Sequence, residues 1–316
     1  MIVLTTLLNI LIFPGFLFAS FIGLLLAGLD RKVLARMQHR IGPPIIQPMY
    51  DFFKLCGKET IIPAAANRHV YMLAPWASLC SLIVMCLFIP IGGLTFFSGN
   101  ADLIVIIYLL TIPGVCLIVG GSSSGSPYAA VGISREMVTM IAYELPLVIV
   151  FLAIARVVGQ GELVFSVKTV AEYQLANGAL ISHIALIPAA IAFLLVIPAE
   201  VGTQPFDTAE AETEICEGPL VEYSGKPLAL FKLNSSLKMF IMSALFTTLF
   251  IGVVYTGIVV VDVIIFIAIC CLVTIICMTL VHAVTARLKI EHLFRFYWTV
   301  VAGIALLSLI LVWAGL

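Results

Sequence analysis

Hydrophobic residues gather in eight long runs along the chain, and shorter polar stretches separate them. A run of about 20 mostly apolar residues is long enough to cross a bilayer as a helix. Only Gly257 to Asp262 separates the sixth run from the seventh. The pattern predicts an all-α, polytopic membrane protein with one membrane domain over residues 1–316. The eight predicted helices cover about 3–29, 70–90, 102–121, 136–156, 180–199, 231–257, 259–281 and 296–315.

The composition excludes a soluble protein. Hydrophobic residues make up 62% of the 316 residues and charged residues only 10%, whereas a soluble domain carries about 25% charged residues. The first apolar run is too long for the core of a signal peptide and has no small-residue cleavage site before its charged flank. We therefore expect no cleaved targeting segment.

Lysine and arginine predict the orientation of the helices. The odd-numbered loops, with their immediate flanks, carry 14 of the 16 cations, and the even-numbered loops carry only Arg156 and Lys168. Cytoplasmic loops are the ones enriched in Lys and Arg. The count predicts a protein of the cell membrane with both termini outside. Its odd loops are then cytoplasmic, including loop one (30–69) and an acidic loop (199–232).

Cysteine and histidine give no metal signature. None of the eight cysteines forms a CxxC pair, and the five histidines are scattered without HExxH spacing. Haem ligation by histidines of two helices stays open, although isolated histidines near charged loops are more often solvated. We predict no iron–sulfur cluster, metal or cofactor on this chain.

The acidic loop is the most unusual stretch. Its prolines and glycines fix turns, so we predict an ordered loop at the membrane surface. We also predict a short helix that begins near Asp207, which serves as its N-cap, with Glu210 and Glu214 on the same side. Crowded carboxylates titrate as a coupled set, so a proton relay and a docking surface both remain open. Before its first cation, Lys226, the loop carries seven acids: Glu200, Asp207, Glu210, Glu212, Glu214, Glu217 and Glu222.

The fourth helix contains one ionisable residue at membrane depth. Glu144 lies among apolar neighbours, and Pro146, which follows it, is expected to kink the helix. Because an ionisable side chain at that depth is costly, it marks a functional site by default. The alternative is a neutral carboxyl that bonds to a neighbouring helix. Arg135 and Glu136 are predicted to open this helix and cap it.

Two further stretches fall in predicted loops. Residues 47–59 can form an amphipathic helix, with Phe52 and Phe53 on one side and Lys54 and Lys58 on the other. It would lie in the membrane interface or pack on the bundle. The Gly- and Ser-rich stretch 120–132 lacks the Gly-Lys-Ser/Thr of a phosphate loop, so we predict a flexible connection there.

Four stretches resemble the H-subunit family, a group of membrane subunits of respiratory complex I. The pattern Ala-Glu-x4-Pro-Phe-Asp-x2-Glu-x-Glu-x-Glu at 199–214, with Val-Glu-Tyr-Ser-Gly at 221–225, is similar to the family's signature loop. Met-Gln-His-Arg-Ile-Gly-Pro at 37–43 and Gln-Pro at 47–48 are similar to its first loop. Ala-Tyr-Glu-Leu-Pro-Leu at 142–147, nine residues after Arg135, is similar to its fourth helix. The agreement spans roughly residues 30–291 in order.

Two departures point to one branch of that family. Quinone-reducing members usually carry Asn-Arg where this chain has Gly202 and Thr203, and their first loop is longer where only residues 44–46 stand here. Both departures resemble the membrane-bound [NiFe] hydrogenases and sulfane-reducing complexes. The Gly- and Ser-rich stretch at 120–125 resembles that branch too.

The resemblance implies a subunit without its own redox centre in a membrane-bound, hydrogenase-type oxidoreductase. Helices two to six would form an antiporter-like five-helix bundle. Iron–sulfur clusters and a [NiFe]-type centre would lie on cytoplasmic hydrogenase-like large and small subunits. Antiporter-like membrane subunits and lipid would be further partners, and nucleic acid would not. The residues implied to couple electron transfer to proton or sodium translocation are Glu144, Glu200, Asp207, Glu210, Glu212, Glu214, Glu222, Glu136 and Arg135.

Three other functions remain open. A quinone-site subunit of a complex I-type enzyme would use the same loops, although Thr203 and the short first loop argue against it. A stand-alone secondary transporter would show inverted repeats and paired broken helices, and the Glu144–Pro146 element has no second copy. In a purely structural anchor, the acids would serve only for docking.

Overall fold

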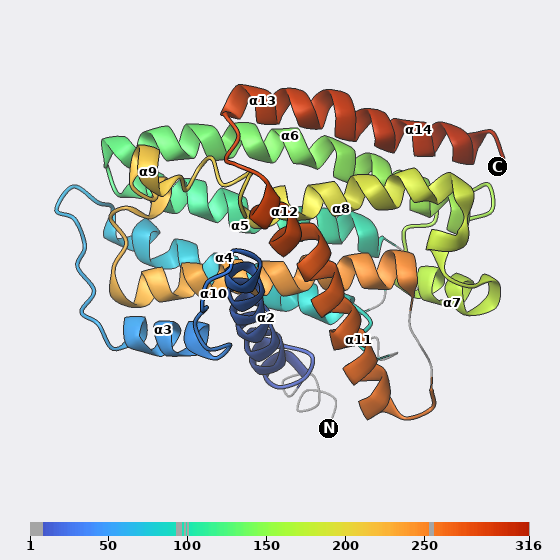
Figure 1. The fold of residues 1–316 in the computed structure, drawn as a ribbon, viewed down its shortest axis with the longest axis horizontal. Helices are drawn as coiled ribbons and strands as arrows, with labels where there is room; N and C mark the ends of the chain where they lie inside the picture. The colour runs from blue at the N-terminus through green and yellow to red at the C-terminus, as the bar shows by residue number, and fades with distance from the viewer. Residues whose placement is uncertain (1–8, 93–96, 98, 100, 253–255, 316) are drawn as a thin grey trace.

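The computed structural model describes residues 9–92, 97, 99, 101–252 and 256–315. In these ranges the chain is helical and has no β-strand; a single β-bridge joins Gln160 and Glu162. Eight of the described helical segments are long and apolar enough to cross a membrane (Figure 1). The predicted all-α membrane fold with eight spans is therefore confirmed.

The spanning segments contain one helix each or a short series of consecutive helices. They are α2 (Phe16–Met37), α4 (Arg68–Phe88), α5 (Asp102–Ser123), α6 (Pro127–Val158), η2 (Ile184–Leu186) with α8 (Ile187–Val201), α10 (Gly225–Phe246) with η4 (Thr247–Ile251), α11 (Val259–Thr274) with η5 (Ile275–Thr279) and α12 (Leu280–Val284), and α13 (Ile290–Phe296) with η6 (Tyr297–Val301) and α14 (Ala302–Trp313). The shorter elements are α3 (Gln47–Cys56), α7 (Val167–Asn177), η1 (Leu180–Ser182), α9 (Glu212–Ile215) and η3 (Gly218–Leu220).

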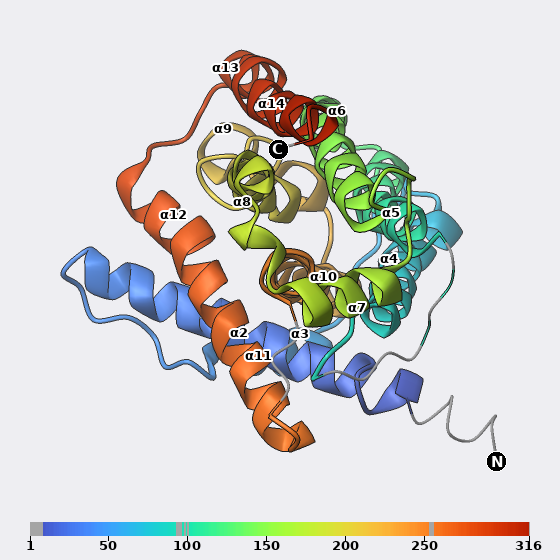
Figure 2. The ribbon, with the colours of Figure 1, turned by 90° about the vertical axis from the view of Figure 1, so that its right-hand side faces the viewer.

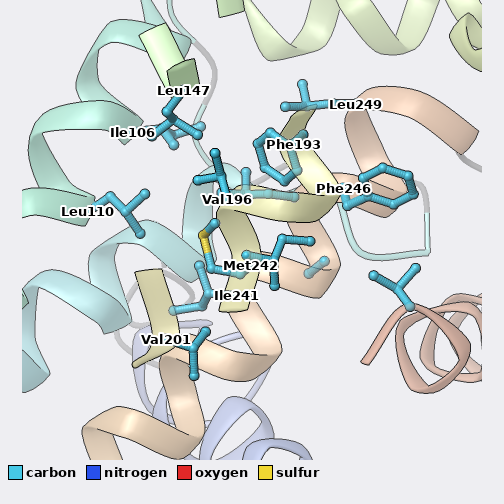
Figure 3. Close-up of a cluster of buried hydrophobic side chains, with 14 of the residues drawn as sticks. Ile106, Leu110, Leu147, Phe193, Val196, Val201, Ile241, Met242, Phe246 and Leu249 are labelled. Atoms are coloured by element: carbon cyan, nitrogen blue, oxygen red, sulfur yellow. The ribbon is translucent and has the colours of Figure 1, made fainter. Parts of the chain in front are cut away.

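Helix α10 forms the centre of the protein. Its most apolar stretch is 89% buried, whereas the corresponding stretches of the last two spans are 28% buried. Figure 2 looks roughly along α10 and shows it inside a ring formed by α2, α4, α5, α6 and α8. In Figure 3, Ile241 and Phe246 of α10 lie in one cluster with Phe193 of α8, Leu147 of α6 and Ile106 of α5. A polar residue on the buried length of α10 is therefore enclosed by protein.

Small residues let neighbouring segments approach α10 and α6 closely. A Cβ atom at Gly23 of α2 would lie 2.7 Å from the Ser236 carbonyl oxygen of α10. A Cβ atom at Gly132 of α6 would lie 2.5 Å from Pro219, which follows the acidic loop's short helix. In a bilayer, helices associate through such close packing because lipid is as apolar as the side chains. These glycines therefore hold α2 against α10 and the acidic loop against α6.

The predicted flexible connection over 120–132 is wrong. Helix α5 continues to Ser123, and α6 already begins at Pro127 and runs for 32 residues. The hydroxyls of Ser123 and Ser124 donate to the carbonyls of Gly120 and Gly121, at 2.6 and 2.7 Å. Serines that bond back to the preceding turn are compatible with a helix end, and proline is favoured at a helix start.

The early start of α6 also changes the place of Arg135 and Glu136. The sequence predicts that these two residues open and cap the helix. This prediction is wrong, because α6 begins at Pro127. With 3.6 residues per turn, both lie about two turns inside it. Their side chains are therefore presented from the middle of a helix face rather than from its end.

The helix predicted near Asp207 is also misplaced. Helix α9 begins at Glu212, after Ala211, and has only four residues. Asp207 does not cap it; the carboxylate pairs instead with Arg287, 80 residues later in the chain. A guanidinium that binds both carboxylate oxygens is a stronger partner than one backbone amide. The side chain of Glu212 lies outside the described part of the structure.

Candidate functional site

A cavity of about 110 Å³ lies beside α10 and brings together acids from three separate segments. Its other walls come from α5, α6, the end of α8 and the acidic loop. By volume it has room for several water molecules. The charged residues that line it are Glu136, Glu200, Asp207, Glu210, Lys232 and Lys238.

A buried ion pair lines this cavity. The Nζ atom of Lys238 on α10 lies 2.7 Å from Oε1 of Glu200, the second-last residue of α8. The two side chains are only 10% and 2% exposed. The Tyr143 hydroxyl of α6 is a further hydrogen-bond partner of Glu200. Buried charges are tolerated when they are paired and hydrogen-bonded, and all three partners come from the helices around the cavity.

Lys238 is the central positive charge of the site. Besides Glu200, it interacts electrostatically with Glu136 of α6 and Glu210 of the acidic loop. Glu136 also interacts with Glu200 and Glu210. Three carboxylates therefore share one buried ammonium group. In such a set, a change of protonation at one member alters the electrostatic energy of the others.

Helix α10 presents a polar stripe to the cavity. Lys232, Ser235 and Lys238 recur three residues apart, which places them on one face of a helix. Asn234 lies next to this stripe, and its Nδ2 atom donates to the Pro75 carbonyl of α4 at 3.1 Å. The stripe therefore runs from two exposed residues, Lys232 and Ser235, to the buried Lys238.

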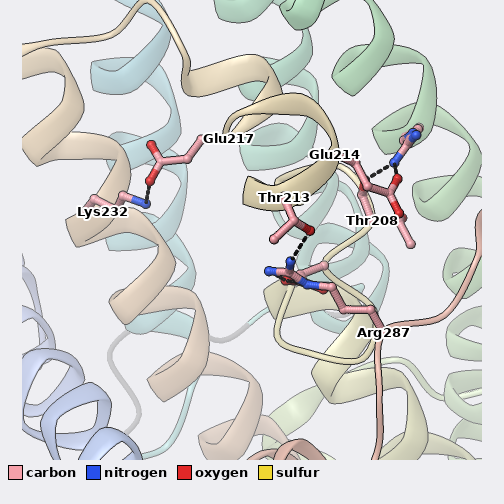
Figure 4. A network of polar contacts seen from close by, with 8 residues as sticks. Thr208, Thr213, Glu214, Glu217, Lys232 and Arg287 are labelled. Carbon is pink, nitrogen blue, oxygen red and sulfur yellow. Dashed lines mark hydrogen bonds and ion pairs between the residues drawn. The ribbon is translucent and has the colours of Figure 1, made fainter.

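Arg287 fastens the acidic loop from the connection between α12 and α13. Its Nη2 atom lies 2.8 Å from Oδ2 of Asp207, and its Nε atom donates to both Asp207 oxygens. Nη1 donates to the Thr213 hydroxyl at 3.1 Å (Figure 4). The Gln204 amide, oriented to satisfy its neighbours, accepts from Arg287 and donates to His282. These bonds hold Asp207 in the cavity wall.

Two more ion pairs tie down the rest of the loop (Figure 4). Arg135 of α6 donates to Glu214 at 2.5 Å and to the Thr208 carbonyl at 3.2 Å. Lys232 faces Glu217 at 3.8 Å. Both pairs are partly exposed, and such pairs contribute about 0–1 kcal/mol each. Arg135 and Glu214 therefore position the loop, and neither lines the cavity.

Glu210, like Asp207, is a cavity acid that lies outside the membrane-spanning helices. Burial raises the pKa of Glu210 above its ordinary value, Lys232 opposes this shift, and Glu217 and Asp207 add to it. The folded protein thus holds the Glu210 proton more tightly than the unfolded chain does. It follows that ionised Glu210 makes the fold less stable as the pH rises above the ordinary carboxyl value.

Glu210→Gln is expected to raise the midpoint of thermal unfolding by a few degrees at about pH 8 and to leave it unchanged at about pH 4. The amide cannot ionise, so the variant avoids the cost that the wild type meets at high pH. Thermal denaturation of the purified protein at both pH values measures the difference. Glu162→Gln, at an exposed carboxylate, is the matched control. A variant that is less stable than wild type at pH 8 would show that attraction by Lys232 outweighs burial.

Glu144 does not line this cavity. It is half-buried and lines a second, largely apolar cavity of about 550 Å³ between α5 and α6, with Thr111 and Met140. Glu144 still interacts electrostatically with Glu200 and Lys238. The carboxyl that the sequence predicts in helix four therefore lies outside the carboxylate cavity but close enough to the buried pair to interact with it.

Glu222 lies outside both linings. Its backbone carbonyl accepts a hydrogen bond from the Tyr71 hydroxyl of α4 at 2.7 Å. The structure therefore gives Glu222 a place beside α4 and does not bring its side chain to the other acids of the site.

Sequence reasoning missed three residues of this site: Lys238, Tyr143 and Arg287. Lys238 lies well inside an apolar run, where a cation marks a functional site just as Glu144 does. Lys238 is instead counted among the loop cations that predict orientation, so this signal is overlooked. Tyr143 directly precedes Glu144. Arg287 gives no signal, because its partners are about 80 residues away.

In the described residues, no group of three or more His, Cys, Asp or Glu side chains is arranged to hold a metal ion. The eight cysteines are free thiols there and do not converge. Carboxylates next to a buried ammonium group are able to transfer protons or to bind a cation.

Comparisons with known proteins agree with the fold. Residues 8–313 match the family described as "NADH dehydrogenase". "Hydrogenase-4 component C" of Escherichia coli is 36% identical over 72% of this chain and 70% of its own length. The H subunit of the NADH-quinone oxidoreductase of Bordetella pertussis is 31% identical over 71% of this chain and 66% of its own length. A chain of an archaeal membrane-bound sulfane sulfur reductase superposes with a TM-score of 0.88 at 31% identity, over 98% of this chain and 99% of that one. This chain is a multi-pass membrane protein and belongs to the NADH dehydrogenase family, with membrane subunits of complex I-like and hydrogenase-4 type complexes among its homologues.

Proposed function

We propose that this chain is the membrane-anchoring and coupling subunit of an ion-translocating redox complex of the hydrogenase type. The observation that carries the proposal is the Glu200–Lys238 pair, buried at the end of a cavity whose wall continues into the acidic loop. Ionisable groups inside a membrane bundle are costly and mark ion pathways. A plain anchor would not need them.

The path that we propose begins at the acidic loop. In this path, Asp207 and Glu210 form the entrance, Glu136 follows, and the Glu200–Lys238 pair comes next. All five residues line the cavity. A change of charge on a redox partner that docks on the loop would shift the proton or sodium occupancy of this set. The coupled set would pass that change inward as an altered electrostatic energy.

Glu144 would carry the path out of the chain. It interacts with the buried pair and lines the apolar cavity between α5 and α6. A carboxyl that faces such an apolar cavity needs a polar neighbour. An antiporter-like membrane subunit that covers this cavity would supply one, so we place the outlet toward ion-translocating partners here.

The hydrogenase-type interpretation rests on the relatives. One relative is named as a hydrogenase-4 component, and the solved structure with the same fold belongs to a sulfane sulfur reductase. We propose that iron–sulfur clusters and a [NiFe]-type centre lie on cytoplasmic large and small subunits. The acidic loop and α3 would face those subunits, and both termini would lie outside the cell.

Glu144→Gln in the intact complex tests the proposal. The complex is reconstituted in vesicles, and hydrogen evolution is measured together with the uptake of protons and of sodium ions. We expect ion uptake per electron to fall roughly tenfold, the scale of coupling energies between linked sites, while hydrogen evolution with an artificial electron donor stays near wild type. Glu222→Gln is the matched control, because Glu222 lines neither cavity.

Each other outcome has a clear meaning. If Glu144→Gln leaves ion uptake unchanged, the chain is an anchor and the path is refuted. If the complex carries flavin and its activity depends on quinone, the chain serves a complex I-type enzyme instead. If the chain purifies alone and transports ions without a redox partner, it is a secondary transporter.

A further inference from the structure

A third cavity, larger than the carboxylate cavity, shares part of its lining on α10. It encloses about 460 Å³ between α2, α3 and α10. Lys232 and Ser235 of α10 line both cavities. The apolar part of its wall comes from Leu24, Ala27, Phe52, Leu55, Leu233 and Met239.

The polar part of this wall has an excess of positive charge. Four cations line it, Arg31, Lys54, Lys58 and Lys232, against two carboxylates, Asp30 and Asp51. Both carboxylates already have partners. The Thr279 hydroxyl donates to Asp30 at 2.6 Å, and Asp51 accepts from Arg31 and Gln47, both at 3.1 Å.

The lysines at the mouth are left without counter-charges. No ion pair joins Lys54 or Lys58 to a carboxylate in the described ranges, and both side chains are exposed. The pair between Lys232 and Glu217 is long, at 3.8 Å, and partly exposed. An anion in the cavity mouth would meet three ammonium groups from two separate segments.

Helix α3 and the turn that follows it combine lysines that line the cavity with exposed aromatic side chains. Lys54 and Lys58 are four residues apart and line the same cavity, whereas Tyr50 and Phe53 are 61% and 65% exposed. Exposed aromatic side chains beside lysines are typical of a helix that lies in the membrane interface. The same cavity also has an apolar wall, formed mainly by residues of α2, α3 and α10.

We propose that this cavity binds one anionic phospholipid. The phosphate lies among Lys54, Lys58 and Lys232, and the upper acyl chains lie against α2 and α10. Basic pockets between membrane helices recognise anionic headgroups, and the cavity has the size of a small-molecule site. A free phosphate would leave the apolar wall uncovered, and a neutral headgroup would leave the three lysines unpaired. Because Lys232 also faces the carboxylate cavity, the lipid would be a structural neighbour of the ion site.

The test uses the complex as it purifies, depleted of lipid in mild detergent. It is titrated with dioleoyl-phosphatidylglycerol or dioleoyl-phosphatidylcholine, and bound lipid is counted by native mass spectrometry. We expect phosphatidylglycerol to bind at concentrations roughly tenfold lower or more, since each lysine near the headgroup favours the anionic lipid. The double variant K54Q/K58Q is expected to bind both lipids alike. Lys289→Gln, at an exposed lysine outside the cavity, is expected to behave as wild type.

Several results would overturn the proposal. The first is equal binding of the two lipids by the wild type. The second is unchanged lipid selectivity in K54Q/K58Q. The third is a loss of lipid selectivity in Lys289→Gln as large as that in K54Q/K58Q. Displacement of the lipid by millimolar inorganic phosphate would indicate a free-phosphate site, and displacement by a short-chain quinone would indicate a quinone site. Because both substituted lysines are exposed, the variants should fold, and co-purification of the partner subunits checks this.

Discussion

Lys238→Met is expected to lower the free energy of unfolding by about 3–5 kcal/mol, the usual cost of removing one partner from a buried ion pair. Methionine fills a similar volume, so the change mainly removes the charge. The Glu200 carboxylate, 4% exposed, would then lose its ammonium partner at 2.7 Å. Glu136 and Glu210 would lose the same positive charge.

Thermal denaturation of the purified complex, followed by size-exclusion chromatography, measures this loss. Lys232→Met is the matched control. Its side chain is 45% exposed and lies 3.8 Å from Glu217, so we expect a change of about 0–1 kcal/mol. The double variant Lys238→Met/Glu200→Gln should regain most of the stability, since replacing both charges of a buried pair is often neutral. A stable single variant, or a double variant with the full sum of both losses, would contradict the role of the pair.

The helices could be predicted because their signal is local. Apolar runs of sufficient length must span the bilayer with their backbone hydrogen bonds satisfied internally, so length and composition decide their number. Their ends depend on finer features. The stretch 120–132 is rich in glycine and serine, yet serine back-bonding at Ser123 and proline at Pro127 keep it helical on both sides of a short break.

The site could be predicted only in part, because its geometry depends on ion pairs between residues that are far apart in the sequence. The acids of 199–222 stand out in the sequence, but which of them turn inward depends on Arg287 and Arg135, which lie 80 and 79 residues from Asp207 and Glu214. Asp207 therefore joins the cavity and Glu214 does not. One further signal is readable in the sequence: the polar stripe of α10, with Lys238 inside an apolar run, needs a buried partner wherever that helix packs.

Glu200→Gln is expected to abolish ion translocation, with a loss of about 100-fold or more, the scale of removing a positioned proton-transfer group. Glutamine keeps the size of the side chain and can still accept a bond from Lys238 or Tyr143. It can neither release a proton nor neutralise the lysine. Glu200 contacts both Lys238 and Tyr143, lines the cavity and interacts electrostatically with Glu144. Its loss would therefore break the proposed link between the cavity and Glu144, while electron transfer on the proposed partner subunits continues.

The double variant Lys238→Met/Glu200→Gln separates coupling from structure. If the pair serves as a relay, the double variant regains stability but not ion uptake per electron, measured in vesicles beside hydrogen evolution. If the pair serves only to hold α8 against α10, both quantities return together. Glu222→Gln, outside the cavity, should keep wild-type values for both. Recovery of ion uptake in the double variant would refute the relay, because a translocation path cannot lose its buried carboxylate–ammonium step and still operate.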